Sequence, residues 1–308
     1  MLSNVEAAAV FLEKEVKAFA DVAVVGISGG VDSAVVASIC AAALGPKNVY
    51  GLSMPYDEID TSTFNSRSAE LADKLGINHL VMSIGVPVDA AVKVMHDAVG
   101  SATEYSDDLH KLTLGNSRSR MRMLYLYGVA GELSYRIEEG QKHKHLSPVR
   151  GELFSKRVRV MGTGNASEDL IGYDTKGGDA LADLFVIGDL FKSEVYQLAK
   201  YYEVPKSIVK APPSAGLYEG QTDVLELGFS YEELEPALSA LHRILSRGVG
   251  DAELSANLPE FGDVTPKTAE FVVRRFLGNA HKHRAPKVVQ IRQTELVKDI
   301  WRSGSGAV

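Results

Sequence analysis

Short apolar segments alternate with helix-like segments near the start of the chain, and this alternation restricts the fold more than any other feature of the sequence. Residues 22–27, 48–54 and 78–84 are rich in β-branched and apolar side chains. Residues 33–44 and 63–75, which separate them, have the character of helices. This order is typical of a parallel sheet with helices on both faces. The sequence therefore predicts a doubly wound α/β fold.

Three later segments also have regular character. Residues 158–162 predict a fourth strand, while residues 115–139 and 189–202 predict helices with apolar residues at three- and four-residue spacing. Residues 140–157 are basic, residues 204–228 contain Pro-Pro and three glycines, and neither stretch has a regular period. We therefore predict one domain over residues 1–308, with a basic insertion near 135–158 and a lid loop, without regular structure, near 204–228.

Composition excludes several classes of protein. The chain has 308 residues, a formal net charge of −7 and one cysteine, Cys40. A single cysteine rules out an intrachain disulfide and a cysteine-rich metal site. No apolar run reaches the roughly 20 residues that span a bilayer, and the acidic balance disfavours a large nucleic acid as the main partner. With no targeting signal at its start, the chain is expected to be cytoplasmic, with neither membrane nor nucleic acid as partner.

The segment SGGVDS, residues 28–33, joins the first predicted strand to a predicted helix. Gly29 and Gly30 allow a tight turn and a close approach to an anion. Ser33 lies at the helix start, where free N–H groups favour phosphate, and Asp32 adds a carboxylate suited to a magnesium ion that bridges phosphate oxygens. The loop therefore predicts phosphate binding, against the alternative of a glycine turn capped by a serine. There is no GxxxxGK[ST] and no GxGxxG after the first strand, so Walker-A and dinucleotide loops are excluded.

The SGGVDS segment resembles the PP-loop of the N-type ATP pyrophosphatase superfamily, which has an adenine nucleotide alpha hydrolase-like fold. Members of that superfamily split ATP into AMP and pyrophosphate to activate an oxygen. Four further motifs follow in order: residues 115–123 (GNSRSRMRM), 162–168 (GTGNASE), 172–192 and 212–223. Together with the PP-loop they resemble the NAD synthetase family, in its ammonia-dependent form or in the synthetase domain of the glutamine-dependent form, from about residue 20 to about residue 290.

The resemblance implies a role for each matching position. The positions that match ATP-binding residues are Gly26, Ser28, Gly29, Gly30, Val31, Asp32, Ser33, Thr163, Lys192 and Ser214. Those that match deamido-NAD-binding residues are Arg120, Lys176, Asp183, His281 and Lys282. Asp32 and Glu168 would hold Mg²⁺, and they would act in catalysis together with Lys192. Asp179 would orient ammonia or take a proton from ammonium, although a carboxylate that merely caps a turn is the alternative there.

The chemistry of the implied substrate agrees with these positions. Deamido-NAD carries a pyrophosphate and a nicotinate carboxylate, which favour cations such as Arg120, Lys176 and Lys282. Asp32 and Glu168 follow predicted strands, and open α/β sheets bind ligands at the carboxyl ends of their strands. Charge that builds up on the α-phosphoryl group requires magnesium and Lys192.

The implied reaction is the ATP-dependent amidation of deamido-NAD to NAD by ammonia, through an adenylated nicotinate carboxylate, with release of AMP and pyrophosphate. ATP is the co-substrate and Mg²⁺ the cofactor. Two alternatives stay open: another PP-loop adenylating ligase, such as a tRNA-modifying lysidine synthetase, and an inactive nucleotide-binding protein. The presence of Asp32, Glu168 and Lys192 argues against the inactive protein.

Some features depart from the family pattern. About 20 residues precede the first predicted strand, so no N-terminal glutaminase domain is expected; ammonia would be free, or would come from a separate glutaminase subunit. His283 stands where the family commonly has arginine, and Arg284 is the candidate replacement. The spacing from Arg120 to Thr163 is longer than in compact members of the family. The basic insertion between them is expected to be a hairpin beside the site, a contact with a partner, or an insertion without effect on function. The resemblance also implies a homodimer.

Overall fold

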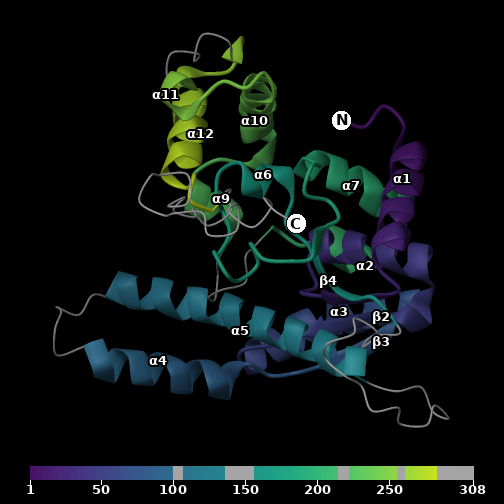
Figure 1. Ribbon diagram of the computed structural model, residues 1–308. Coiled ribbons are helices and arrows are strands. Elements are labelled where there is room, and N and C mark those ends of the chain that lie inside the picture. The colour runs from purple at the N-terminus through teal and green to yellow at the C-terminus, as the bar shows by residue number, and fades with distance from the viewer. Residues whose placement is uncertain (100–106, 136–155, 214–221, 255–260, 283–308) are drawn as a thin grey trace, which may run out of the picture.

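The computed structural model describes residues 1–99, 107–135, 156–213, 222–254 and 261–282 (Figure 1). Its centre is a five-stranded sheet in the order β3-β2-β1-β4-β5, in which every neighbouring pair is parallel. The strands are β1 (Val22–Gly26), β2 (Val49–Ser53), β3 (Asn78–Val81), β4 (Val158–Gly162) and β5 (Leu184–Phe185). The predicted doubly wound α/β fold is confirmed.

The helices connect and cover these strands. In chain order they are α1 (Val5–Phe19), α2 (Val31–Leu44), the 3-10 helix η1 (Pro46–Asn48), α3 (Glu58–Leu75), α4 (Gly85–Val99), α5 (Asp107–Tyr135), α6 (Ala166–Asp169), α7 (Lys192–Tyr201), α8 (Lys206–Val209), α9 (Asp223–Leu227), α10 (Tyr231–Ser246), α11 (Asp251–Leu254) and α12 (Pro266–Gly278). Among the described residues, no helix is both long and apolar enough to cross a membrane.

Strand β1 separates two hydrophobic cores, because successive side chains of a strand point to opposite faces of the sheet. Ala23 and Val25 belong to a core that includes residues of α1, α2, α3 and α7. Val22 and Val24 belong to a second core, built with α4 and α5. Figure 1 shows α4 and α5 side by side, away from the group formed by α1, α2 and α7. Helices therefore cover both faces, as the alternation of segments predicts.

A third core lies between α10 and α12 and includes Leu170 and Ile171, next to the short helix α6. Leu238 of α10 is fully buried within it. Replacing Leu238 by alanine leaves a cavity, so the free energy of unfolding should fall by about 3 kcal/mol. Urea denaturation measures this loss. The matched control is Leu225→Ala on α9, where the leucine is 76% exposed; if both changes cost the same, α10 does not pack as described.

Several boundaries differ from the sequence-based expectations. Helix α2 begins at Val31 and α5 at Asp107, both earlier than predicted. The last four residues of the helix predicted over 115–139 lie outside the described residues. Helix α4 and strand β5 were not predicted; β5 has only two residues, too few to leave a periodic pattern. The stretch 204–228, expected to lack regular structure, contains α8 and α9. Both are too short for apolar periodicity to be recognised.

Candidate active site

The SGGVDS loop connects β1 to α2 through serine hydroxyl bonds. The N–H of Ser28 donates to Oγ of Ser33 at 3.2 Å, and that hydroxyl donates to the carbonyl of Gly30 at 3.0 Å. Gly29 has φ +76°, a left-handed conformation that favours glycine. The helix begins at Val31, so Ser33 lies within its first turn and does not cap it; Gly30 is the N-cap. The first N–H groups of α2 therefore have no intrahelical acceptor and are available to an anion.

Neighbouring elements hold the start of this loop in place. The hydroxyl of Ser68, on α3, donates to the carbonyl of Ile27 at 2.9 Å, and Ser53, at the end of β2, does so at 3.4 Å. Both serines are almost completely buried. They anchor the residue at which the chain leaves β1. Neither serine was predicted from the sequence, because a buried serine that bonds to a carbonyl far along the chain has no local signature.

Asp32, Glu168 and Lys192 meet at the carboxyl edge of the sheet. Nζ of Lys192 lies 2.6 Å from Oδ2 of Asp32 and 3.0 Å from Oε1 of Glu168. The three residues come from the first turn of α2, from α6 and from the first position of α7. The lysine side chain is only 4% exposed, whereas the two carboxylates are 18% and 19% exposed. The predicted catalytic carboxylates and lysine are thus brought into one ion-paired cluster.

Asn165 forms hydrogen bonds with both acidic residues of the cluster. Its Nδ2 donates to Oδ1 of Asp32 at 3.0 Å, and its Oδ1 accepts the backbone N–H of Glu168 at 3.1 Å, which caps α6. Asn165 is fully buried, and Ser167 completes the arrangement by accepting the backbone N–H of Lys192 at 3.0 Å. Asn165 stands within one of the predicted motifs, but no role was predicted for it from the sequence. Its place just before a helix was the available signal.

Burial and mutual charge perturb the cluster. Burial raises the pKa of Glu168 to about 7, although the charge of Lys192 opposes the rise. Burial lowers the pKa of Lys192, but Asp32 and Glu168 outweigh that effect, so its pKa lies above the ordinary value. Burial also raises the pKa of Asp223, a nearby residue on α9 that accepts a hydrogen bond from Tyr231 at 2.9 Å. Three acidic residues, Asp32, Glu168 and Asp223, thus lie near one lysine. An added cation would stabilise the charged forms of their carboxylates.

The residues present fit a magnesium ion. Mg²⁺ in proteins is usually held by one or two carboxylates, with substrate phosphates and water completing the shell. Asp32 and Glu168 approach a single point, now taken by the Lys192 ammonium. Across the part of the chain that the structure describes, no group of three or more histidine, cysteine or acidic residues could hold a metal. This donor set accordingly depends on phosphate oxygens for completion.

A second group of predicted residues gathers where the 172–183 segment meets α5 and the end of α12. Nε of Arg120 donates to the carbonyl of Lys176 at 3.3 Å, and Nζ of Lys176 donates to the carbonyl of His281 at 2.8 Å. Nζ of Lys282 donates to the carbonyls of Gly172 and Asp174 at 2.7 and 2.6 Å. The predicted substrate-binding cations therefore lie together, although they come from distant parts of the chain.

Two acidic residues predicted to belong to the site accept hydrogen bonds from the backbone. Asp183 accepts the N–H of Val160 on β4 at 2.8 Å and the hydroxyl of Tyr127 at 3.3 Å. Asp179 accepts the N–H of Thr175 at 2.8 Å and the hydroxyl of Ser119 at 2.7 Å. Asp179 does cap a turn, as the alternative interpretation held. The same residue also borders a cavity, so the two interpretations are compatible.

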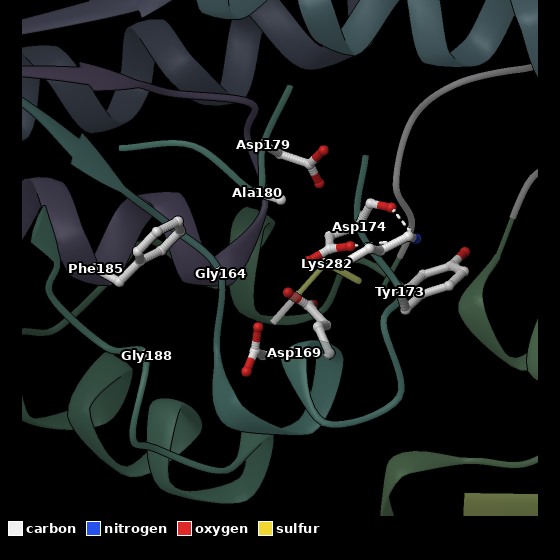
Figure 2. Close-up of a pocket in the computed structure, with 10 residues that line it drawn as sticks. Gly164, Asp169, Tyr173, Asp174, Asp179, Ala180, Phe185, Gly188 and Lys282 are labelled. Carbon is white, nitrogen blue, oxygen red and sulfur yellow. Dashed lines mark hydrogen bonds and ion pairs between the residues drawn. The ribbon is translucent and has the colours of Figure 1, made fainter. Parts of the chain in front are cut away.

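The cavity, of about 280 Å³, connects the two groups (Figure 2). Figure 2 shows the carboxylates of Asp169, Asp174 and Asp179 around it, with Lys282 paired to Asp174. Its lining residues are Gly164, Glu168, Asp169, Tyr173, Asp174, Asp179, Ala180, Phe185, Gly188 and Lys282. Glu168 belongs to both the cavity and the Lys192 cluster. A molecule in the cavity would therefore lie next to Glu168, one of the two carboxylates expected to bind magnesium.

The remaining predicted residues lie at the margins of the site or beyond the described chain. Thr163 is half-buried in the connection between β4 and α6, and Gly26 ends β1. Ser214, His283 and Arg284 lie outside the described residues, as does most of the basic insertion. At the end of that insertion, Arg157 pairs with Asp21 at 2.9 Å.

Comparison with known proteins decides the family. The family model described as NAD synthase matches residues 4–144 and 154–286. The chain belongs to the NAD synthase family. The unmatched residues 145–153 fall within the basic stretch. The sequence-based prediction of a ligase of this family is confirmed, and the comparisons do not favour a lysidine synthetase.

Individual relatives agree with the NAD synthase assignment. The chain is 35% identical to an NH(3)-dependent NAD(+) synthetase of Methanosarcina acetivorans, over 89% of this chain and 92% of the relative. Among solved structures it is similar to an NMN synthetase from Francisella tularensis, with 27% identity, a TM-score of 0.66 and coverage of 93% and 98%. An NH3-dependent NAD synthetase from Campylobacter jejuni is 26% identical, with a TM-score of 0.61 and coverage of 92% and 97%.

Proposed function

We propose that this NAD synthase family member amidates deamido-NAD to NAD, with ATP and ammonia as co-substrates. The observation that carries the proposal is the convergence of Asp32, Glu168 and Lys192 beside the SGGVDS loop. Free N–H groups at the start of α2 would bind ATP phosphates, and the carboxylates would bind the accompanying Mg²⁺. Thr163 and Ser214 would add hydroxyl contacts to ATP.

The chemistry proceeds in two steps. The nicotinate carboxylate attacks the α-phosphorus of ATP, and the bond to pyrophosphate breaks. Ammonia then attacks the adenylated carboxyl carbon; the bond from that carbon to the AMP oxygen breaks and the nitrogen loses a proton, which leaves NAD and AMP. No protein nucleophile is needed, so the residues of the chain act through position and charge.

Each group of residues has its part in these steps. Asp32 and Glu168 would hold Mg²⁺, which would supply positive charge to the phosphates. Lys192, whose ammonium now lies between Asp32 and Glu168, would turn toward the phosphates and neutralise the charge that develops there. Lys282, which lines the cavity, would bind the anionic dinucleotide together with Arg120, Lys176 and His281. Asp183 would complete this substrate-binding group. Asp179 would receive the nitrogen source.

We also propose a homodimer. Large apolar side chains are exposed on α4 and α5, and exposed apolar surface of this kind favours a protein interface. Those side chains are Val94, Met95, Val99, Leu112 and Leu124. Sedimentation of the purified chain tests the proposal, and a monomer at micromolar concentration would contradict it.

The function is tested by mixing the protein with deamido-NAD, ATP, magnesium and ammonium. Equal amounts of NAD, AMP and pyrophosphate are expected. Nicotinate mononucleotide should be assayed in parallel, because one structural relative is named an NMN synthetase. ADP and phosphate as products would refute adenylation. A requirement for glutamine and a second protein would assign the nitrogen source to a separate glutaminase subunit.

A further inference from the structure

Asp179 presents two chemically different carboxylate oxygens. Oδ1 accepts the backbone N–H of Thr175 at 2.8 Å and the hydroxyl of Ser119 at 2.7 Å. Oδ2 accepts no hydrogen bond from any of the described residues. Asp179 borders the cavity of about 280 Å³ (Figure 2). One oxygen is therefore fixed by the protein, and the other is available to a ligand.

Ser119 holds Asp179 from two directions. Its hydroxyl donates to the carboxylate of Asp179, and the same oxygen accepts the backbone N–H of Asp179 at 3.1 Å. A hydroxyl has one proton and two lone pairs, so both bonds form at once. Ser119 is 6% exposed and lies on α5, a long helix packed on the sheet. A rigid element thus determines where this carboxylate points.

The 175–180 loop approaches α5 as closely as its sequence allows. A β-carbon on Gly178 would lie 2.3 Å from Oγ of Ser119, closer than atoms can approach. Glycine at this position lets the loop reach the serine. The contact between Ser119 and Asp179 therefore depends on the serine of α5 and on the glycine of the loop.

The cavity suits a small cation or hydrogen-bond donor. Among the described residues, its lining contains the acidic side chains of Glu168, Asp169, Asp174 and Asp179 and one cationic side chain, Lys282. That lysine is paired with Asp174. Lined in this way, the cavity attracts ammonium from solution.

We propose that Ser119 is a positioning residue for the nitrogen-adding step. It fixes Oδ1 of Asp179 so that Oδ2 accepts a hydrogen bond from the incoming ammonium or ammonia. The inference rests on the proposed function and deepens it. Ser119 touches no reacting atom; it acts through Asp179 alone.

The test compares Ser119→Ala with Thr175→Val. Thr175 also joins the loop to α5, since its hydroxyl donates to Oδ1 of Asn116 at 2.9 Å. Only its backbone N–H, which the change to valine keeps, donates to Asp179. Ser119→Ala should raise the KM for ammonium about tenfold, the effect of losing a hydrogen bond to a charged group. The KM for deamido-NAD and the pyrophosphate released in one turnover without ammonium should stay at the parent values. Thr175→Val should leave all three near the parent values.

A second variant, Gly178→Ala, should reproduce the ammonium-specific defect, because the added methyl group pushes the loop away from Ser119. An unchanged KM for ammonium in Ser119→Ala would overturn the inference, as would an equal rise in Thr175→Val. A parallel rise in the KM for deamido-NAD would show that Ser119 has a general structural role and no specific role toward ammonium. If the parent protein makes no NAD, the proposed function itself fails. If the parent protein is active and Ser119→Ala and Gly178→Ala keep its KM for ammonium, the inference fails and the proposed function stands.

Discussion

Replacing Lys192 by methionine is expected to lower the kcat of NAD formation by about a thousandfold. Lys192 Nζ lies within 3.0 Å of both carboxylates that would hold magnesium, so it is a cation beside the expected metal and phosphate site. Methionine keeps much of the length of the side chain and removes its charge. A fixed positive charge stabilises the negative charge that develops in the transition state most strongly when the site is largely shielded from water.

The thousandfold loss is measured by steady-state kinetics, with folding followed by circular dichroism. Asp32 and Glu168 lose their shared counter-ion, but both are partly exposed, so the free energy of unfolding should fall by less than about 3 kcal/mol. The matched control is Lys200→Met, at the exposed end of the same helix, which should keep parental activity. A loss of less than tenfold in the Lys192 variant would remove Lys192 from the chemistry.

The second large effect is expected from Asp32→Asn, which should abolish measurable turnover. The change keeps the shape of the side chain and an oxygen that can accept the hydrogen bond from Asn165. It removes one of the two charges on which magnesium would depend, and it points an N–H group at Lys192. The fold should persist while the metal site fails.

Thermal denaturation separates this explanation from a general loss of activity. With ATP present, added magnesium should raise the melting temperature of the parent protein, because a ligand that binds only the folded state stabilises it. The Asp32 variant should lose this response. Asp189→Asn, a change to a carboxylate that is 92% exposed, should retain it. If Asp32→Asn only raises the KM of a substrate and keeps kcat, the metal role is wrong.

Much of the site could be predicted because its key residues lie beside regular elements of the sequence. The SGGVDS segment stands between an apolar strand and a helix, and this context by itself indicates a phosphate loop. Glu168 and Lys192 were placed by their motifs, and the folded sheet brings their charged atoms to 3.0 Å from each other. Parallel strands end at one edge, so motifs that follow different strands gather there.

Other features were decided only by the tertiary structure. The sequence does not indicate that Lys192 neutralises both carboxylates, since this depends on three helices starting at one point. Nor does it reveal the two-way contact of Ser119 with Asp179, 60 residues apart in the chain. Local patterns report the intrinsic preferences of a segment, whereas these contacts arise from the packing of distant segments. The sequence alone therefore determined four of the five strands and the SGGVDS loop between β1 and α2, and the packing of α5, α6 and α7 decided how the charged side chains meet.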